Sequence, residues 1–207
     1  MVEESSSLWA SPIVLVKKRD GSLRFCVDYR QLSAVTRKDV FPLPCIDDLL
    51  DQLSGRKVFS TLDAWAGYWQ IRMSESSKEM TAFVTFEGLY QFRVLLFGLC
   101  NGPATFQCLM QSVLRGLGGE KPFCHAYIDI IVYSDSVEEH VNHLQQVFDR
   151  LRQVRLKLHP KKCRIAYPKV DYLGHVVSAA GVYPDPSKLK DVQRFPVPTT
   201  IRAVRSS

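Results

Sequence analysis

The sequence predicts an α+β fold in which helices cover one face of an antiparallel sheet. Two turn signals support the antiparallel sheet, because Asp20-Gly21 and Glu87-Gly88 each separate two apolar or β-branched runs. Helical segments lie between the predicted strands, but without the regular strand–helix–strand rhythm of a parallel sheet. The chain shows no internal repeat and no low-complexity linker.

The first hairpin is predicted between residues 12 and 27. Residues 12–16 and 23–27 are apolar or β-branched, and Asp20-Gly21 supplies the turn. The tip and the returning strand carry four basic residues, which are Lys17, Lys18, Arg19 and Arg24. Taken alone, such a cluster favours a solvated basic face over a phosphate-binding surface.

A short helix and a buried strand are predicted next. Two closely spaced prolines enforce an extended link before the helix. Residues 46–53 then place apolar side chains at helical spacing and end at Ser54-Gly55, a C-terminal stop signal. The apolar strand that begins near Val58 ends at an acidic residue, Asp63.

The middle of the chain is predicted to contain a second hairpin, a helix and a further strand pair. The hairpin turns at Glu87-Gly88, and a glycine-rich loop then leads into an apolar helix from about Ala104. Residues 125–134, HAYIDIIVYS, form either a strand pair or one bent strand, with Asp129 in the middle.

The C-terminal third is predicted to begin with an amphipathic helix over residues 137–156. Its apolar face comprises Val141, Leu144, Val147, Phe148 and Leu151. His140 and His143 could form half of a metal site, but no cysteine or histidine cluster completes it, so two exposed histidines are expected. Residues 157–182 are typical of short strands and turns, and residues 185–195 of a last short helix stopped by prolines.

Size, charge and cysteine pattern limit the class of protein. A chain of 207 residues can form one large domain or two small lobes with a core. The net charge of +6 is compatible with an anionic partner such as nucleic acid, but also with a basic protein that binds none. Six cysteines without a CxxC pair favour free thiols over disulfides or a zinc site. No apolar run approaches the ~20 residues that span a bilayer, so a soluble protein without a membrane partner is expected.

Two acidic residues are candidates for metal binding. Asp129 is flanked by isoleucines, where a charge is costly unless it meets a metal, a cation or water. Nucleotidyl transfer uses two divalent cations held by carboxylates, and Mg²⁺ takes few protein carboxylates together with phosphate oxygens and water. Considered separately, Asp63 is more typical of a helix N-cap than of a metal ligand, and Asp129 is compatible with a turn carboxylate.

Five segments resemble, in order and spacing, the motifs of reverse transcriptases from long-terminal-repeat retrotransposons of the Ty3/gypsy type. The segments are SPIVLVKKRDGSLRFCVDYRQL, FSTLDAWAGYWQI, FGLCNGPATFQ, YIDI followed by IVYS, and DYLGHVVSAAGV. The similarity extends from about Ser7 to the C-terminus. Five ordered motifs do not arise by chance, so an unrelated α+β domain is set aside.

The resemblance implies a fingers-and-palm architecture within a Pol polyprotein fragment. Residues 1–57 would be partial fingers with a clipped N-terminus. Residues 58–178 would be the palm, with an inserted fingers segment and a primer-grip hairpin. Residues 179–207 would be the truncated start of the thumb or connection.

The resemblance also implies roles for individual residues. Asp63 and Asp129 would be the catalytic, metal-binding aspartates. Lys162 would be the general acid for pyrophosphate, with Lys161 as a possible substitute. The nucleotide-binding residues would be Lys18, Arg24, Tyr68 as the steric gate, Phe97 and Gly98. The primer grip would comprise Tyr172, Leu173 and Gly174, and the helix from Ala104 would brace the template.

The chain departs from the family pattern at the second aspartate. The family box has two adjacent aspartates, whereas Asp129 is followed by Ile130, and the spacing to the next helix is one residue short. We interpret this as a one-residue deletion, which would also change the face of the following side chains. In addition, Leu96 replaces the usual proline and Gly102 the usual alanine.

The resemblance therefore implies an RNA-directed DNA polymerase with a Mg²⁺ or Mn²⁺ two-metal site, weakened in this copy. Its partners would be an RNA or DNA template with a primer, and deoxynucleoside triphosphates. The alternative is a non-catalytic nucleic-acid-binding remnant of a retrotransposon polyprotein. The polyprotein neighbours, ribonuclease H and integrase, are expected to be absent from this chain. If expressed, the protein is expected in the cytoplasm or a virus-like particle, since no targeting signal is seen.

Overall fold

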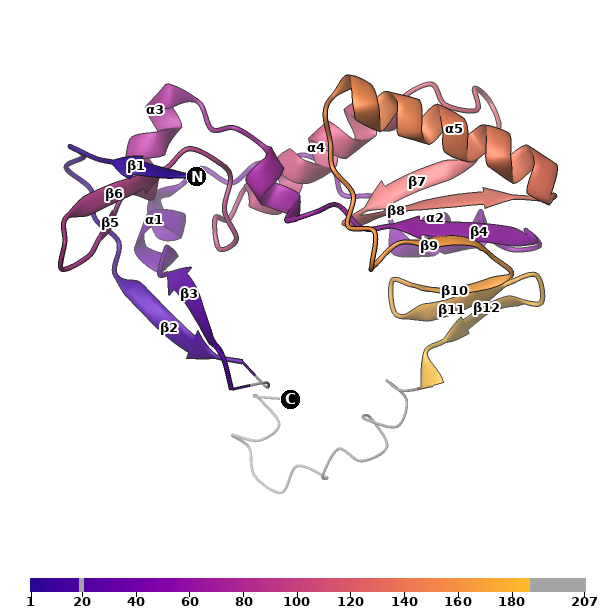
Figure 1. Cartoon of the computed structure of the whole chain (residues 1–207), viewed down its shortest axis with the longest axis horizontal. Helices are drawn as coiled ribbons and strands as arrows, with labels where there is room; N and C mark the ends of the chain where they lie inside the picture. Colours follow the sequence, from indigo (N-terminus) through magenta and orange to yellow (C-terminus); the bar gives the residue numbers. More distant parts are fainter. Residues whose placement is uncertain (19–20, 187–207) are drawn as a thin grey trace.

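The computed structural model describes residues 1–18 and 21–186, which form two lobes connected through central segments (Figure 1). The strands are β1 (Val2–Glu4), β2 (Ile13–Lys17), β3 (Leu23–Val27), β4 (Val58–Leu62), β5 (Phe83–Val84), β6 (Leu89–Phe92), β7 (Cys124–Tyr127), β8 (Asp129–Ser134), β9 (Arg164–Tyr167), β10 (Lys169–Tyr172), β11 (His175–Ser178) and β12 (Gly181–Pro184). The α-helices are α1 (Arg30–Val35), α2 (Ile46–Asp51), α3 (Glu75–Lys78), α4 (Gly102–Leu114) and α5 (Val137–Gln153). Two 3₁₀ helices, η1 (Gly67–Gln70) and η2 (Glu79–Thr81), complete the described elements.

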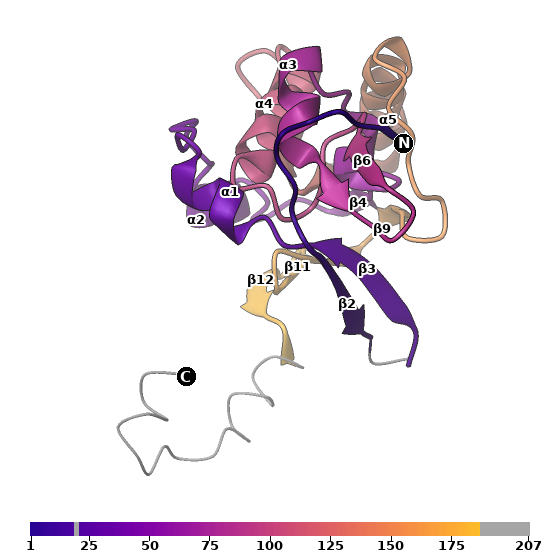
Figure 2. The same ribbon diagram turned by 90° about the vertical axis from the view of Figure 1, so that its left-hand side faces the viewer.

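The first lobe contains a small sheet and a projecting hairpin. The sheet has the order β1-β6-β5, and the hairpin β2–β3 forms a separate two-stranded sheet. Figure 2 shows that this hairpin extends away from the body of the lobe. Both predicted hairpins are present, since β2 pairs with β3 and β5 pairs with β6 in antiparallel register.

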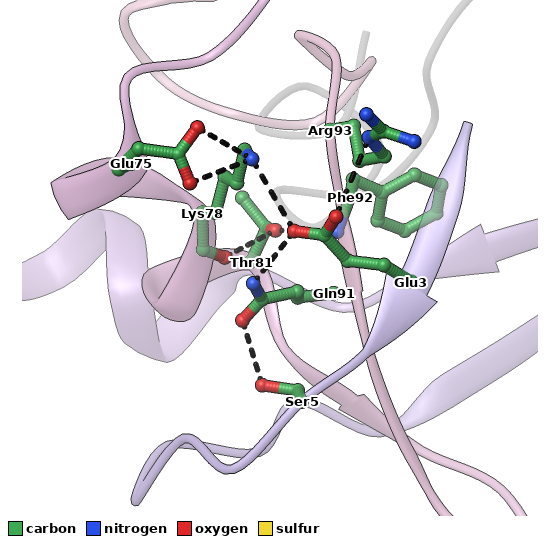
Figure 3. A network of polar contacts seen from close by, with 8 residues as sticks. All are labelled: Glu3, Ser5, Glu75, Lys78, Thr81, Gln91, Phe92 and Arg93. Atoms are coloured by element: carbon green, nitrogen blue, oxygen red, sulfur yellow. Dashed lines mark hydrogen bonds and ion pairs between the residues drawn. The ribbon is translucent and has the colours of Figure 1, made fainter.

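A polar network fastens strand β1 to its neighbours (Figure 3). Lys78 is 8 % exposed, and its ammonium lies 3.3 Å from a Glu3 carboxylate oxygen and 2.7 Å from Glu75. Gln91 donates to Glu3 at 3.0 Å, and Arg93 lies 3.3 Å from the other Glu3 oxygen. The buried ammonium is therefore neutralised by carboxylates, as a buried charge requires.

The second lobe is built around a four-stranded antiparallel sheet with the order β7-β8-β4-β9. Every residue of β4 is buried, because both faces of the sheet are covered. On one face, Leu62 and Ile130 pack with residues of α4 and α5. On the other face, Phe59 and Ile131 pack against α2 and the sheet β10-β11-β12. The predicted α+β fold is confirmed, with the second face covered as well.

The buried face of α5 differs from the predicted face by one position. His140, Leu144, Val147 and Leu151 are buried, whereas Val141 is 61 % exposed. The prediction of exposed histidines was therefore wrong. His140 is 1 % exposed, and its two ring nitrogens lie 2.7 Å from Ser60 Oγ and 2.8 Å from Ser134 Oγ. His143 stacks on Phe123, with 3.8 Å between ring centroids.

Two further sequence-based predictions concern the described residues. All six cysteines lie in the described part of the chain, and they are free thiols there, as expected. No helix in the described ranges is long and apolar enough to cross a membrane. The last predicted helix, over residues 185–195, falls almost wholly outside the described residues, as does Arg19 of the first hairpin.

Candidate functional site

Asp63 and Asp129 occupy adjacent positions at one end of the four-stranded sheet. Leu62, the last residue of β4, pairs with Ile130 of β8. The next position beyond this pair is Asp63 on one strand and Asp129 on the other. Both residues line the same two cavities. The structure thus brings the two predicted carboxylates together, although they are far apart in the sequence.

The hairpin that carries Asp129 has an unusually short turn. Tyr127 of β7 pairs with Asp129 of β8, so Ile128 alone connects the two strands. Two residues are the shortest common hairpin connection. Ile128 has a φ of 67° and is 64 % exposed. Positive φ is a genuine outlier for a β-branched residue, so the turn stores backbone strain.

The shortened turn leaves the downstream strand in a packed register. Ile130 and Val132 join the core beneath α4 and α5, while Ile131 and Tyr133 join the core on the opposite face. Every one of these side chains is buried, so the strand keeps normal packing and the unusual backbone geometry of the short turn lies at Ile128. A one-residue connection is therefore compatible with a folded sheet, at the expense of turn geometry.

Burial and charge act together on Asp129. Burial raises the pKa of Asp129 above its ordinary range, and the nearby Asp63 carboxylate raises it further. The Lys162 ammonium opposes both effects and lowers this pKa. An additional cation between the carboxylates would relieve the repulsion in the same way.

The donor set fits a hard divalent cation. Mg²⁺ binds through one or two protein carboxylates and completes its shell with water and phosphate oxygens. Asp63 and Asp129 provide such a pair of oxygen ligands at one position. Within the described ranges, no group of three or more histidine, cysteine or acidic side chains is arranged to hold a metal ion.

Lys162 lies directly beside Asp63. Its Nζ is 3.4 Å from Asp63 Oδ2, and the lysine side chain is 61 % exposed. The backbone N–H of Lys162 donates to the His159 carbonyl at 2.9 Å. The His159 N–H in turn donates to the Asp63 carbonyl at 2.8 Å, so the lysine and the aspartate share one backbone network.

Gln70 supports this network, and the sequence analysis did not identify it. Its side-chain amide donates to the carbonyls of Trp65 and Lys157 at 2.7 and 2.9 Å, and its oxygen accepts from the Lys157 N–H at 2.6 Å. Gln70 therefore fixes the start of the segment that carries Lys162. The two partners are 87 residues apart in the chain, so no local sequence signal marks the contact.

Five of the predicted site residues line one cavity of about 400 Å³, and these are Asp63, Tyr68, Phe97, Asp129 and Lys162. The Tyr68 ring lies 4.7 Å from the Phe97 ring and meets the Phe106 ring edge-on at 5.4 Å. Burial raises the pKa of Tyr68, so its hydroxyl is neutral at physiological pH. The cavity thus combines a carboxylate pair, a lysine and an aromatic wall.

The predicted primer-grip residues line a second cavity of about 390 Å³. Tyr172, Leu173 and Gly174 form the β10–β11 turn, and they face Asp63, Asp129 and Lys162 across this cavity. The Ile128 turn borders both cavities. The carboxylate pair therefore lies between an aromatic pocket and the hairpin formed by β10 and β11.

Three predicted residues lie outside both cavities. Lys18 and Arg24 are exposed on the hairpin β2–β3, which projects on the other side of the gap in Figure 1. Gly98 follows Phe97 with a φ of 97°, a conformation that favours glycine, and packs near the Tyr29 ring. Gly98 therefore affects the backbone conformation of the loop that carries Phe97.

Comparisons with known proteins identify the family of the chain. Residues 16–177 match the family described as reverse transcriptase (RNA-dependent DNA polymerase). The chain is 39 % identical to the retrovirus-related Pol polyprotein from transposon 297 of Drosophila melanogaster, across 100 % of this chain and 20 % of that protein. It is 34 % identical to the Pol polyprotein from transposon gypsy of the same organism, again across 100 % of this chain and 20 % of that protein.

Among solved structures, the foamy viral protease–reverse transcriptase in complex with double-stranded DNA has a TM-score of 0.87 and 26 % identity. This similarity covers 99 % of the present chain and 36 % of the viral one. The chain thus spans about a fifth of the length of the two transposon polyproteins and about a third of the viral protein.

Proposed function

The chain belongs to the reverse transcriptase family of RNA-directed DNA polymerases, in its Ty3/gypsy-type retrotransposon branch, and on this premise we propose that it is a nucleotidyl-transfer module with an impaired site. The observation that carries the proposal is the position of Asp63 and Asp129 next to the last β4–β8 pair, Leu62 and Ile130. The two aspartates line one cavity together with Tyr68, Phe97 and Lys162.

Asp63 and Asp129 would hold Mg²⁺ or Mn²⁺. When bound, such cations lower the pKa of a primer hydroxyl and neutralise triphosphate charge. The Lys162 ammonium, beside Asp63, would donate a proton to departing pyrophosphate. Tyr68 and Phe97 would form the floor beneath the nucleotide sugar. Gly98 would shape the adjacent loop, and Lys18 and Arg24 would contact the triphosphate when the hairpin approaches.

The remaining parts would bind the template–primer. Tyr172, Leu173 and Gly174 would position the primer end, because their turn faces the carboxylates across the second cavity. Residues 1–57 would form partial fingers, 58–178 the palm with its inserted fingers segment, and 179–207 the start of the thumb or connection. In the whole element, the segment would function within a longer Pol polyprotein, in company with ribonuclease H and integrase and inside a virus-like particle.

Impairment follows from the short Tyr127–Asp129 turn. Removing one well-placed electrostatic group from an active site costs about a hundred- to a thousandfold in rate. Here one carboxylate fewer is combined with a strained connection at Ile128. The same observation favours the second candidate function, a non-catalytic module that binds nucleic acid without extending a primer.

A primer-extension assay with Mg²⁺ or Mn²⁺ separates the two functions. We expect slow extension by the unmodified chain at high enzyme concentration, and none by Asp63→Asn. Identical traces for both proteins, together with intact template–primer binding, would favour the non-catalytic function. Absence of both extension and binding would contradict both.

A further inference from the structure

The ammonium of Lys162 lies beside the carboxylate on which a divalent cation would bind. It lies 3.4 Å from Asp63 Oδ2, and it borders both cavities on which Asp63 and Asp129 open. Asp129 lines the same two cavities, so the ammonium lies at the site that both carboxylates share.

The backbone keeps this ammonium near the aspartates. Hydrogen bonds connect Lys162 to His159 and His159 to Asp63, and Gln70 fixes the segment at Lys157. The backbone of Lys162 is thus held close to Asp63, so the effective concentration of the ammonium at the Asp63 carboxylate is high. The neighbouring Lys161 is also exposed but borders neither cavity.

The site offers few carboxylate oxygens that two cations could share. With two carboxylates, a divalent ion and the ammonium must compete for the same lone pairs or repel each other at close range. We propose that Lys162 is a built-in competitor of Mg²⁺ or Mn²⁺ at the Asp63–Asp129 pair, so that cation binding requires displacement of its ammonium. This inference rests on the proposed function, because it assumes that the pair binds a divalent cation.

The expected effect is moderate, because the lysine is more than half exposed. Exposed ion pairs are weak, and a flexible lysine can swing away from an incoming ion. Removing the ammonium should therefore increase the affinity for a divalent cation about three- to tenfold.

The test is a titration of the full chain with Mn²⁺ alone, in which free Mn²⁺ is quantified by electron paramagnetic resonance. Lys162→Gln removes the charge, Lys162→Arg keeps it, and Lys161→Gln removes the same charge one position away. We expect tighter binding for Lys162→Gln, and affinities within about twofold of the unmodified chain for the other two. Asp63→Asn should abolish binding at this site.

The outcomes separate the inference from the function on which it rests. Equal affinities for Lys162→Gln and Lys161→Gln, or weaker binding by Lys162→Gln, would overturn the competition while leaving a metal site in place. Mn²⁺ binding that Asp63→Asn leaves unchanged would place the ion elsewhere, and it would overturn both the competition and the metal site of the proposed function. No Mn²⁺ binding by any variant would have the same consequence.

Discussion

Tyr127 and Asp129 pair directly across the β7–β8 hairpin, with only Ile128 between them. This relationship places a carboxylate beside Asp63 while forcing a β-branched residue to a φ of 67°. The same turn therefore keeps Asp129 beside Asp63 and strains the backbone at Ile128. It also shows that a hairpin with a one-residue connection can still belong to a packed sheet.

Relief of this strain should stabilise the protein. Ile128→Asn should raise the free energy of unfolding by about 1 kcal/mol, because asparagine tolerates the left-handed conformation better than isoleucine. Little burial is lost, since Ile128 is 64 % exposed. Urea denaturation provides the measurement. The matched control is Ile165→Asn in β9, where the residue is 44 % exposed and φ is not positive. If both substitutions destabilise equally, Ile128 is not strained.

Stability should decline on acidification because of His125. Burial lowers the pKa of His125 to about 4, and its Nε2 lies 2.7 Å from the Tyr133 hydroxyl. The unfolded chain takes up this proton near pH 6.5, whereas the folded chain does so only near pH 4. The contribution of His125 to the free energy of unfolding is therefore complete above pH 6.5 and is lost as the pH falls towards 4.

The slope in this window should be at most about 1.4 kcal/mol per pH unit for one histidine. His125→Gln should reduce the slope without removing it, because the pKa of His140 is also lowered by burial and by His143. Denaturation at several pH values compares the two proteins. An unchanged slope in the variant would show that His125 is protonated equally in both states.

Binding to a template–primer should depend on salt through the hairpin β2–β3. Each lost phosphate contact reduces the slope of log affinity against log salt by about 0.9. Arg24→Gln should show this reduction. Arg152→Gln removes the same charge from α5, which lies on the opposite side of the sheet from β10–β12 in Figure 1, and should retain the original slope. Equal slopes for all three proteins would exclude Arg24 as a phosphate contact.

Local signals in the sequence predicted much of this fold. The hairpins at Asp20-Gly21 and Glu87-Gly88, and the strand that ends at Asp63, follow from turn chemistry and apolar runs, which act over a few residues. The tertiary contacts of individual side chains do not follow from such local signals. Apolar periodicity assigns a histidine to the surface, whereas His140 is buried with its two ring nitrogens hydrogen-bonded to Ser60 and Ser134 on two different strands.

The candidate site shows the same division. Acidic residues at strand ends and the family resemblance indicate Asp63 and Asp129, but neither indicates Gln70, whose role depends on a distant backbone segment. The strain at Ile128 likewise emerges only once the pairing of Tyr127 with Asp129 is known. The sequence predicts a one-residue deletion near Asp129, whereas the one-residue connection at Ile128 is visible only in the sheet.

The packing of Ile130 also changes how the missing carboxylate should be restored. From the sequence, Ile130→Asp adds an aspartate without changing the length. In the structure, Ile130 is 1 % exposed within the core beneath α4 and α5, so a charge there would unfold the sheet. Ile128→Asp is the better comparison, since it adds a carboxylate at an exposed position and leaves the turn one residue long.

The most direct measurement is primer extension by three proteins: the unmodified chain, Ile128→Asp, and the chain with an aspartate inserted between Asp129 and Ile130. The insertion restores both the second carboxylate and a two-residue turn, so it should extend a primer about a hundred- to a thousandfold faster than the unmodified chain. Ile128→Asp should recover less, because the turn remains short, and Asp63→Asn added to the insertion should abolish the gain. Extension by the unmodified chain as fast as by the insertion variant would contradict the account of an impaired polymerase.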